Sequence, residues 1–167
     1  MKIAIISDIH DNIKNLEKTL KYCRDNLVSE LICCGDLTSI ETLNFLNDNF
    51  FGHIYYTFGN ADNPELLSLK FKKKYKKTKI FSDFGKIKLS DKKIAFVHYP
   101  DIAKELCQKG AYDFVFYGHT HKPWDENEGN CRLLNPGNIS NFGYAPTFAV
   151  WDMVENYFTL VEVNNLL

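Results

Sequence analysis

The sequence lacks a long apolar run, and no stretch reaches the roughly 18 apolar residues that would suggest a membrane-spanning helix. The apolar run at residues 2–7 is too short for the core of a signal peptide and is followed directly by an acid. The chain also lacks an internal repeat and a linker rich in proline, glycine or serine. We therefore expect a single domain over residues 1–167, located in the cytoplasm and not associated with a membrane.

Cysteines are few, and their spacing fits neither a disulfide framework nor a zinc site. Their number is odd and no C-x-x-C pair occurs, so we expect small buried thiols in a reducing compartment. Two of them are adjacent on one apolar run and should point to opposite faces of a sheet. The five are Cys23, Cys33, Cys34, Cys107 and Cys131.

An excess of charge of one sign is also absent. The formal net charge is -1 and the hydrophobic fraction is 45%, which describes an ordinary globular protein and excludes a generic nucleic-acid binder or a disordered tail. The one local asymmetry is the lysine-rich segment at residues 70–79. It is either a solvated helix end and loop or a surface that attracts anionic substrate or nucleic acid.

The pattern of apolar residues predicts an α/β fold. In the first half strands alternate with helices, which begin near Asn12, at the N-cap Ser39 and at Pro64, and this order is typical of a parallel sheet. The second half is richer in strands and contains one helix at residues 102–109. The strands expected at residues 132–134, 147–152 and 157–163 are predicted to be antiparallel. We expect two sheets packed face to face with helices outside. The predicted strands cover residues 2–7, 31–34, 53–58, 81–84, 87–89, 94–98, 114–117, 132–134, 147–152 and 157–163.

Polar motifs follow five of the apolar runs, where predicted strands end. In open α/β sheets, ligands collect at the carboxyl ends of strands. Together the motifs offer seven expected metal-ligand side chains, and carboxylate, amide and imidazole groups are the ligand types of a two-metal site. The motifs are Asp8-Ile9-His10, Gly35-Asp36, Gly59-Asn60-Ala61-Asp62, His98 and Gly118-His119-Thr120-His121.

This ordered set resembles the calcineurin-like metallophosphoesterases, and the short chain is similar to the small single-domain YfcE-like phosphodiesterases. The resemblance implies a four-layer αββα sandwich of two mixed β-sheets flanked by helices. It also implies two divalent metal ions, expected to be Mn, with Ni, Fe, Co or Zn as alternatives. One ion would be bound by Asp8, His10, Asp36 and His121, and the other by Asp36, Asn60, His98 and His119, with Asp36 shared and the second four also catalytic.

By this resemblance the protein is a metal-dependent phosphoesterase, and a phosphodiesterase in particular. Water activated between the two metals would attack phosphorus. The expected substrate is a small phosphodiester or a nucleotide-like molecule, with nucleic acid as a less favoured partner and the oligomeric state left open. Ala61 stands where relatives that hydrolyse monoesters or cut DNA commonly carry a histidine that protonates the leaving oxygen, so we expect a preference for activated diesters.

Two alternative functions remain from the sequence. A nuclease is a narrower version of the same class, disfavoured by Ala61 and by the lack of an added DNA-binding domain. A non-catalytic protein-interaction scaffold is a different class, because the retromer subunit keeps this fold while acting mainly as a binding module. Loss of His10 or another ligand would favour the scaffold, and every expected ligand type is present.

Several single positions carry open alternatives. Tyr99 follows His98 where the family usually has glycine, and it either lines the substrate pocket or only packs. The turn at residues 135–137 is either purely structural or supports the metal site. Asp62 is expected to be a hydrogen-bonding support. His53 opens the third strand, at the end away from the site, and is excluded from the ligand set.

Overall fold

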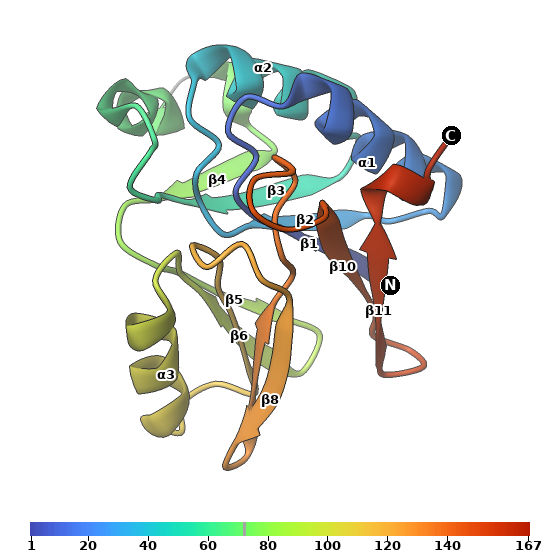
Figure 1. The fold of residues 1–167 in the computed structure, drawn as a ribbon. Coiled ribbons are helices and arrows are strands. Elements are labelled where there is room, and N and C mark those ends of the chain that lie inside the picture. The colour runs from blue at the N-terminus through green and yellow to red at the C-terminus, as the bar shows by residue number, and fades with distance from the viewer. Residues whose placement is uncertain (72) are drawn as a thin grey trace.

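The computed structural model describes residues 1–71 and 73–167 as eleven strands, three α-helices and three short 3-10 helices (Figure 1). Lys72 of the lysine-rich segment lies outside the described residues. In chain order the elements are β1 (Lys2–Ile6), α1 (Ile13–Asp25), β2 (Glu30–Cys33), α2 (Ile40–Asn49), β3 (His53–Thr57), η1 (Pro64–Phe71), η2 (Lys73–Tyr75), β4 (Thr78–Phe81), β5 (Gly85–Leu89), β6 (Lys92–Phe96), α3 (Pro100–Gln108), β7 (Phe114–Phe116), β8 (Trp124–Glu128), β9 (Cys131–Asn135), β10 (Thr147–Asp152), β11 (Tyr157–Glu162) and η3 (Val163–Asn165).

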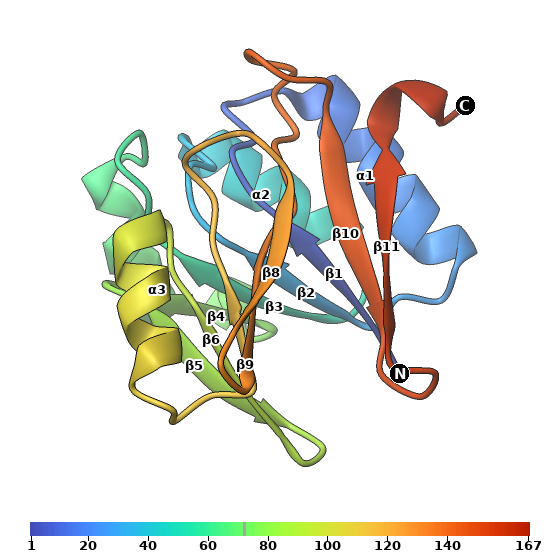
Figure 2. The same cartoon turned by 60° about the horizontal axis from the view of Figure 1, so that its bottom comes forward.

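Two sheets lie face to face with helices on their outer faces, which confirms the predicted four-layer αββα sandwich of two mixed β-sheets (Figures 1 and 2). The first sheet has the order β11-β10-β1-β2-β3-β4 and the second the order β5-β6-β7-β9-β8. In the first sheet β1 to β4 are parallel and β10 runs antiparallel to β1. In the second, β6, β7 and β9 are parallel, while β5 and β8 pair antiparallel at the edges.

Three apolar clusters fill the spaces between the four layers. Alternate residues of β1 enter different clusters: Ala4 and Ile6 pack under α1 and α2, whereas Ile3 and Ile5 face the second sheet. A third cluster lies between the second sheet and α3. Because both faces of the central strands are buried, their sequences are near-continuous apolar runs. Cys33 and Cys34 enter different clusters, as the sequence predicted.

The strand predictions are wrong at three places. The strand expected at residues 81–84 lies instead at Thr78–Phe81, where it pairs with β3 and forms one edge of the first sheet. No strand was predicted at β8, because its residues are largely exposed and mostly polar. The strand at residues 132–134 was expected to be antiparallel, but β9 runs parallel to β7 and antiparallel to β8.

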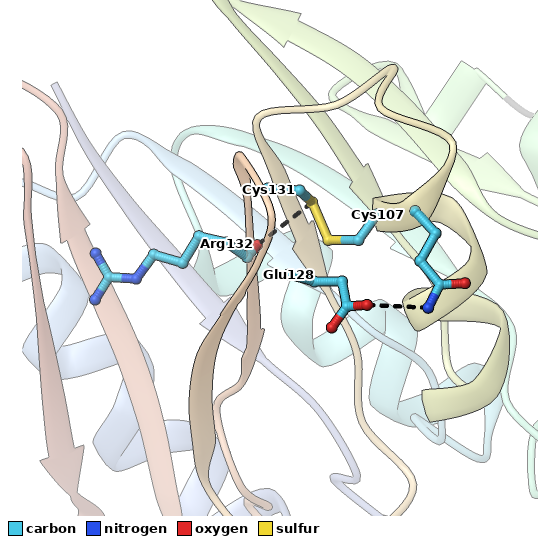
Figure 3. The surroundings of a disulfide bond; sticks show 5 residues. Cys107, Glu128, Cys131 and Arg132 are labelled. Carbon is cyan, nitrogen blue, oxygen red and sulfur yellow. Dashed lines mark hydrogen bonds between the residues drawn. A yellow bond between two sulfur atoms is a disulfide. The ribbon is translucent and has the colours of Figure 1, made fainter.

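A disulfide joins Cys107, in the last turn of α3, to Cys131 at the start of β9 (Figure 3). The expectation of five unpaired thiols is therefore wrong for this pair. The two residues are separated by 24 positions, but α3 packs on β9 and brings their Cα atoms to 5.4 Å. A hydrogen bond of 3.0 Å from Gln108 to Glu128 also joins α3 to β8. The other three cysteines are buried and free, as expected.

Part of the lysine-rich segment packs against the first half of the chain. The Lys74 ammonium lies 2.9 Å from the side-chain oxygen of Asn44 and 3.4 Å from the carboxylate of Asp48. Lys79 lies over the ring of Tyr55 at 5.8 Å. For the described part of the segment, these contacts favour a helix end and loop over a surface that attracts anionic substrate or nucleic acid.

Within the described ranges no helix is both long enough and apolar enough to cross a bilayer.

Candidate metal centre

The polar motifs meet because they follow strands whose carboxyl ends lie at the same end of both sheets. Loops after β1, β2 and β3 supply residues from the first sheet, and loops after β6 and β7 supply residues from the second. Backbone hydrogen bonds hold the loops together within each sheet, from Asp8 to the Gly35 carbonyl and from Gly118 to the His98 carbonyl, each at 3.0 Å. The amide of His119 donates to Asp8 Oδ2 at 3.0 Å and joins the two sheets.

One group of ligand atoms gathers around Asp8. Its Oδ1 atom lies 3.2 Å from His121 Nε2 and 3.8 Å from His10 Nε2. His10 Nε2 is also 3.5 Å from Asp36 Oδ2. This first group therefore consists of the four residues that the sequence resemblance assigned to one metal ion: Asp8, His10, Asp36 and His121.

A second group gathers around His98 Nε2. This atom lies 3.4 Å from Asp36 Oδ2, 3.1 Å from Asn60 Oδ1 and 3.2 Å from His119 Nδ1. Asp36 Oδ2 is thus close to one histidine of each group, which is the position that a bridging carboxylate needs. The structure brings all seven predicted side chains together, whereas the excluded His53 is exposed and contacts Glu30 at the far end of β3.

Five of the seven side chains sit on left-handed backbone. The φ angles are 53° at Asp8, 45° at His10, 53° at Asp36, 68° at His119 and 59° at His121. Each such residue costs on the order of 1–3 kcal/mol and persists only where its surroundings fix it. Because strained residues cluster at functional sites, this concentration of strain is an independent indication that the two groups of ligands have a function.

Glycines next to the ligands provide the space that the side chains occupy. A Cβ atom at Gly59 would lie 2.2 Å from Asp36 Oδ1, and one at Gly118 would lie 2.7 Å from Asp8 Oδ2. Gly35 combines a close approach to His98 with a φ of +100°, which glycine adopts without strain. Of the three, only Gly35 has left-handed backbone, and Gly59 and Gly118 are needed because they have no side chain.

Asp62 supports the loops without entering either group. Its carboxylate accepts three backbone hydrogen bonds, from Asp36 at 2.9 Å, Thr38 at 2.7 Å and Gly59 at 2.7 Å. Burial raises the pKa of this carboxyl, and the bonds from Thr38 and Gly59 oppose the rise. The expectation that Asp62 is a hydrogen-bonding support is confirmed.

Backbone carbonyls orient two of the histidines. His98 Nδ1 lies 2.9 Å from the Cys34 carbonyl, and His121 Nδ1 lies 3.0 Å from the Phe142 carbonyl. Since a carbonyl only accepts, Nδ1 is the donor in both rings, and each Nε2 is directed to the ligand groups. Such partners fix the ring orientation of metal-binding histidines. Sequence reasoning found neither, because a backbone carbonyl carries no residue-type signal.

Two buried asparagines hold the loop that carries His119 and His121. Asn135 donates to the Gly118 carbonyl at 2.9 Å and to Thr120 Oγ1 at 3.0 Å, so the turn at residues 135–137 supports the site. Asn138 donates to the His121 carbonyl at 3.1 Å. Sequence reasoning missed Asn138, although its place three residues after Asn135 was the available signal.

The electrostatics of the two groups favour a bound cation. Burial alone would raise the pKa of both Asp8 and Asp36, but the neighbouring histidines lower both below the ordinary value. Conversely, burial lowers the pKa of His98 while Asp36 and Asp8 raise it above the ordinary value. Within the described part of the chain, Asp8 Oδ1 and His10 Nε2 are buried without a hydrogen-bond partner. A buried carboxylate oxygen and a buried imidazole nitrogen without a hydrogen bond fit a divalent metal ion.

Two neighbours of the ligands define the rest of the site. The amide of Ala61 donates to Asp36 Oδ1 at 2.8 Å, so this residue lies beside the second group but offers only a methyl side chain. The ring of Tyr99 contacts the rings of His98 and His119, with centroids 5.1 and 5.3 Å apart. The arrangement is suited to binding two cations and an anionic group between them.

Comparisons with known proteins show the family and the fold of the chain. The sequence pattern of the calcineurin-like phosphoesterase superfamily domain matches residues 1–156. The phosphodiesterase MJ0936 of Methanocaldococcus jannaschii is 30% identical over 155 residues, covering 91% of this chain and 93% of the relative. The structure of an archaeal phosphodiesterase superposes with a TM-score of 0.88 at 28% identity, covering 97% of this chain and 99% of the other.

More distant structures share the fold. YfcE, a phosphoesterase from E. coli, has a TM-score of 0.70 at 19% identity and covers 98% of this chain and 100% of its own. Vps29 of Entamoeba histolytica, solved in complex with zinc, has a TM-score of 0.66 at 18% identity, covering 98% of this chain and 100% of its own. At these identities the likeness concerns the fold alone.

Proposed function

The chain belongs to the calcineurin-like phosphoesterase superfamily, and on this basis we propose that it is a dinuclear metal-dependent phosphodiesterase. The observation that carries the proposal is the position of Asp36 Oδ2, which lies 3.5 Å from His10 Nε2 and 3.4 Å from His98 Nε2. A single carboxylate oxygen between two sets of imidazole and oxygen ligands is what a pair of neighbouring cations requires.

Each group of ligands would hold one cation. Asp8, His10 and His121 would bind the first and Asn60, His98 and His119 the second, with Asp36 in contact with both. Imidazole and carboxylate ligands together suit Mn, Fe, Co, Ni or Zn, and Mn remains our first choice. When bound, two such cations lower the pKa of a water molecule and neutralise charge on the phosphoryl oxygens.

The protein contributes fixed geometry to the reaction. The Cys34 carbonyl holds the His98 ring with Nε2 toward the second group, and the Phe142 carbonyl does the same for His121 at the first. Because both rings are held before substrate arrives, little reorganisation is needed during the reaction. We propose Asp36, Asn60, His98 and His119 as the catalytic residues, since they form the group that lies beside Ala61 and the exposed ring of Tyr99.

The chemistry at position 61 supports a substrate with a good leaving group, and the similarity to a phosphodiesterase supports a diester. Alanine offers no proton to a leaving oxygen, and the carboxylate of the neighbouring Asp62 is occupied by three backbone amides. Leaving groups that depart without protonation, such as those of activated diesters, are therefore favoured. We propose a small phosphodiester or nucleotide-like molecule as the substrate.

The scaffold function is less well supported than the enzyme. A scaffold does not need left-handed backbone at five ligand positions, or buried atoms without a hydrogen bond such as Asp8 Oδ1 and His10 Nε2. The nuclease alternative keeps the same centre and differs in substrate size. The cytoplasmic location stays a prediction, and the Cys107–Cys131 pair does not support the reducing compartment on which it partly rested.

The proposal is tested by metal reconstitution. The purified protein is stripped with a chelator, reloaded separately with Mn, Ni, Zn or Mg, and assayed on matched panels of phosphomonoesters and phosphodiesters, while bound metal is counted by mass spectrometry. We expect close to two ions per chain and faster hydrolysis of activated diesters than of monoesters. Asp36→Asn should abolish the activity and reduce the bound metal.

A matched substitution controls for loss of a carboxylate elsewhere. Asp25 is exposed and pairs with Lys21 and Arg24 at the end of α1, so Asp25→Asn should keep both metal and activity. Activity that survives Asp36→Asn would come from a contaminant or another site. A protein that takes up no divalent metal would refute the enzyme proposal.

A further inference from the structure

Two exposed aromatic side chains flank the candidate metal centre, one beside each group of ligands. Tyr99, just before α3, keeps 37% of its surface exposed, and Phe142, in the loop before β10, keeps 75%. The ring of Tyr99 contacts His119 of the second group at 5.3 Å, and the ring of Phe142 contacts His121 of the first at 6.3 Å. Each group of ligands thus has one exposed aromatic ring beside it.

The backbone of both residues is held in place although their rings are exposed. The Tyr99 carbonyl accepts the amide of Ala103 at 3.0 Å in the first turn of α3. The Phe142 amide donates to Asn138 Oδ1 at 3.2 Å, and its carbonyl accepts His121 Nδ1 at 3.0 Å. A ring on a fixed backbone loses little freedom when it binds a ligand, so these rings are prepared for binding.

The number and nature of these rings match one class of substrate. A phosphodiester carries two organic groups on phosphorus, whereas a monoester carries one. Aromatic rings pair with other planar groups at centroid distances of about 4.5–7 Å, which an exposed ring beside the centre permits. Single exposed aromatic residues are common on surfaces, but here one stands beside each group of ligands.

We propose that Tyr99 and Phe142 bind the two organic groups of a phosphodiester, and that they select diesters whose groups are planar and aromatic. This inference rests on the proposed function, because it requires the phosphoryl group to lie between the two groups of ligands. It explains why tyrosine is acceptable after His98: the ring takes part in binding the substrate.

Binding is measured first, with ligands that cannot be hydrolysed. Diphenylphosphinate and dimethylphosphinate have the same charge and the same two oxygens, and their organic groups are joined by carbon–phosphorus bonds. Titration calorimetry on the Mn-loaded protein should give an affinity for the diphenyl ligand at least about 10-fold above that for the dimethyl ligand. Tyr99→Leu and Phe142→Leu should each reduce this preference by about 3- to 10-fold.

A control variant removes an exposed aromatic residue elsewhere. Phe51 is 58% exposed and precedes β3, at the end of the sheet away from the centre, so Phe51→Leu should leave the preference unchanged. Affinity for dimethylphosphinate should be the same in all variants. If Tyr99→Leu weakens both ligands equally, Tyr99 only supports His98 and His119, and its part of the proposal is wrong.

Kinetics then separate the two sources of a planar group. Three diesters with one common leaving group are compared: bis(p-nitrophenyl) phosphate, methyl p-nitrophenyl phosphate and the p-nitrophenyl ester of thymidine 5′-phosphate. We expect a lower KM for bis(p-nitrophenyl) phosphate or for the thymidine ester than for the methyl ester, because both carry a second planar group. The ester with the lowest KM tells whether an aryl group or a nucleobase fits. Each leucine variant should raise that KM with little change in kcat.

Two results overturn the inference. The first is equal affinity of the wild-type protein for both phosphinates. The second is a preference for diphenylphosphinate that is as large in Tyr99→Leu and in Phe142→Leu as in Phe51→Leu. Failure of the proposed function looks different, because the protein would then hydrolyse no diester with any metal and bind neither phosphinate.

Discussion

Replacing Asp62 by asparagine tests whether one buried carboxylate holds the loops that shape the candidate centre. Asp62 Oδ2 accepts the amides of Asp36 and Gly59, and Oδ1 accepts the amide of Thr38. Asparagine has a single acceptor oxygen, and its amino group would face a backbone N–H at the other position. The better orientation of the amide places its oxygen at the Oδ2 position. The variant then loses the hydrogen bond from Thr38, and the bonds from Asp36 and Gly59 change from charged to neutral.

The expected loss follows from these three bonds. A hydrogen bond to a charged group contributes about 1.5–3 kcal/mol and a neutral one about 0.5–1.5 kcal/mol. The lost bond costs about 1.5–3 kcal/mol and each weakened bond about 1–1.5 kcal/mol, which together make about 3.5–6 kcal/mol. Burial raises the pKa of Asp62, which shows that burying its charge opposes folding, and removing that charge returns part of the loss. The net decrease in the free energy of unfolding should be about 2–4 kcal/mol.

Urea unfolding followed by circular dichroism measures this change. Asp113→Asn is the control, because the exposed Asp113 carboxylate accepts one backbone amide, from Lys93 at 2.7 Å, and should lose less than about 1 kcal/mol. Asp62→Ala leaves all three amides without an acceptor and should lose more than Asp62→Asn. Because Asp36 is held by Asp62, metal affinity should fall as well. A loss for Asp62→Asn no larger than that for Asp113→Asn would refute the reasoning.

Three further predictions concern single positions. Gly59→Ala places a Cβ atom 2.2 Å from Asp36 Oδ1 and should lower metal affinity by about 10- to 100-fold, measured by competition with a chelator; unchanged affinity would show that Asp36 tolerates displacement. Ala61→His should speed hydrolysis of esters with poor leaving groups by up to about 100-fold and flatten the dependence of rate on leaving-group pKa; an unchanged slope would mean that position 61 does not face the leaving oxygen. Cys131→Ser should lower the free energy of unfolding by about 3 kcal/mol, because the Cys107–Cys131 bond closes a chain segment of 24 residues. A reductant should destabilise the parent protein by a similar amount and leave Cys131→Ser unchanged, so equal effects on both would contradict the disulfide.

Much of the fold was predictable because burial leaves a local pattern in the sequence. The central strands are apolar on both faces, and the first two helices begin at polar caps: Asn12 Oδ1 accepts the amide of Asn15, and Ser39 Oγ accepts that of Thr42. The strand at Trp124–Glu128 escaped prediction since its residues are mostly exposed and polar, and only pairing with β9 makes it a strand. Nothing local marks such a strand.

In the candidate site, too, some residues were predictable from the sequence and others were not. Ligand types are a property of single residues, so Asp8, Asp36 and His98 were recognisable from their places after apolar runs. Their supports were not recognisable, because the Cys34 carbonyl that orients His98 belongs to the backbone of a distant strand. Asn138 is a buried side chain whose role depends on a loop 17 positions away.

The amino-acid sequence by itself determined the type of fold and the choice of candidate ligand side chains, because strand burial and residue chemistry are expressed over a few neighbouring positions. Only the tertiary structure decided that these side chains meet. His119 and Asp8 are 111 residues apart and are joined by one hydrogen bond across the two sheets, and Asp36 stands between two sets of histidines. Such proximity results from how the two sheets pack on one another, and a linear pattern contains no distance between segments far apart in the chain.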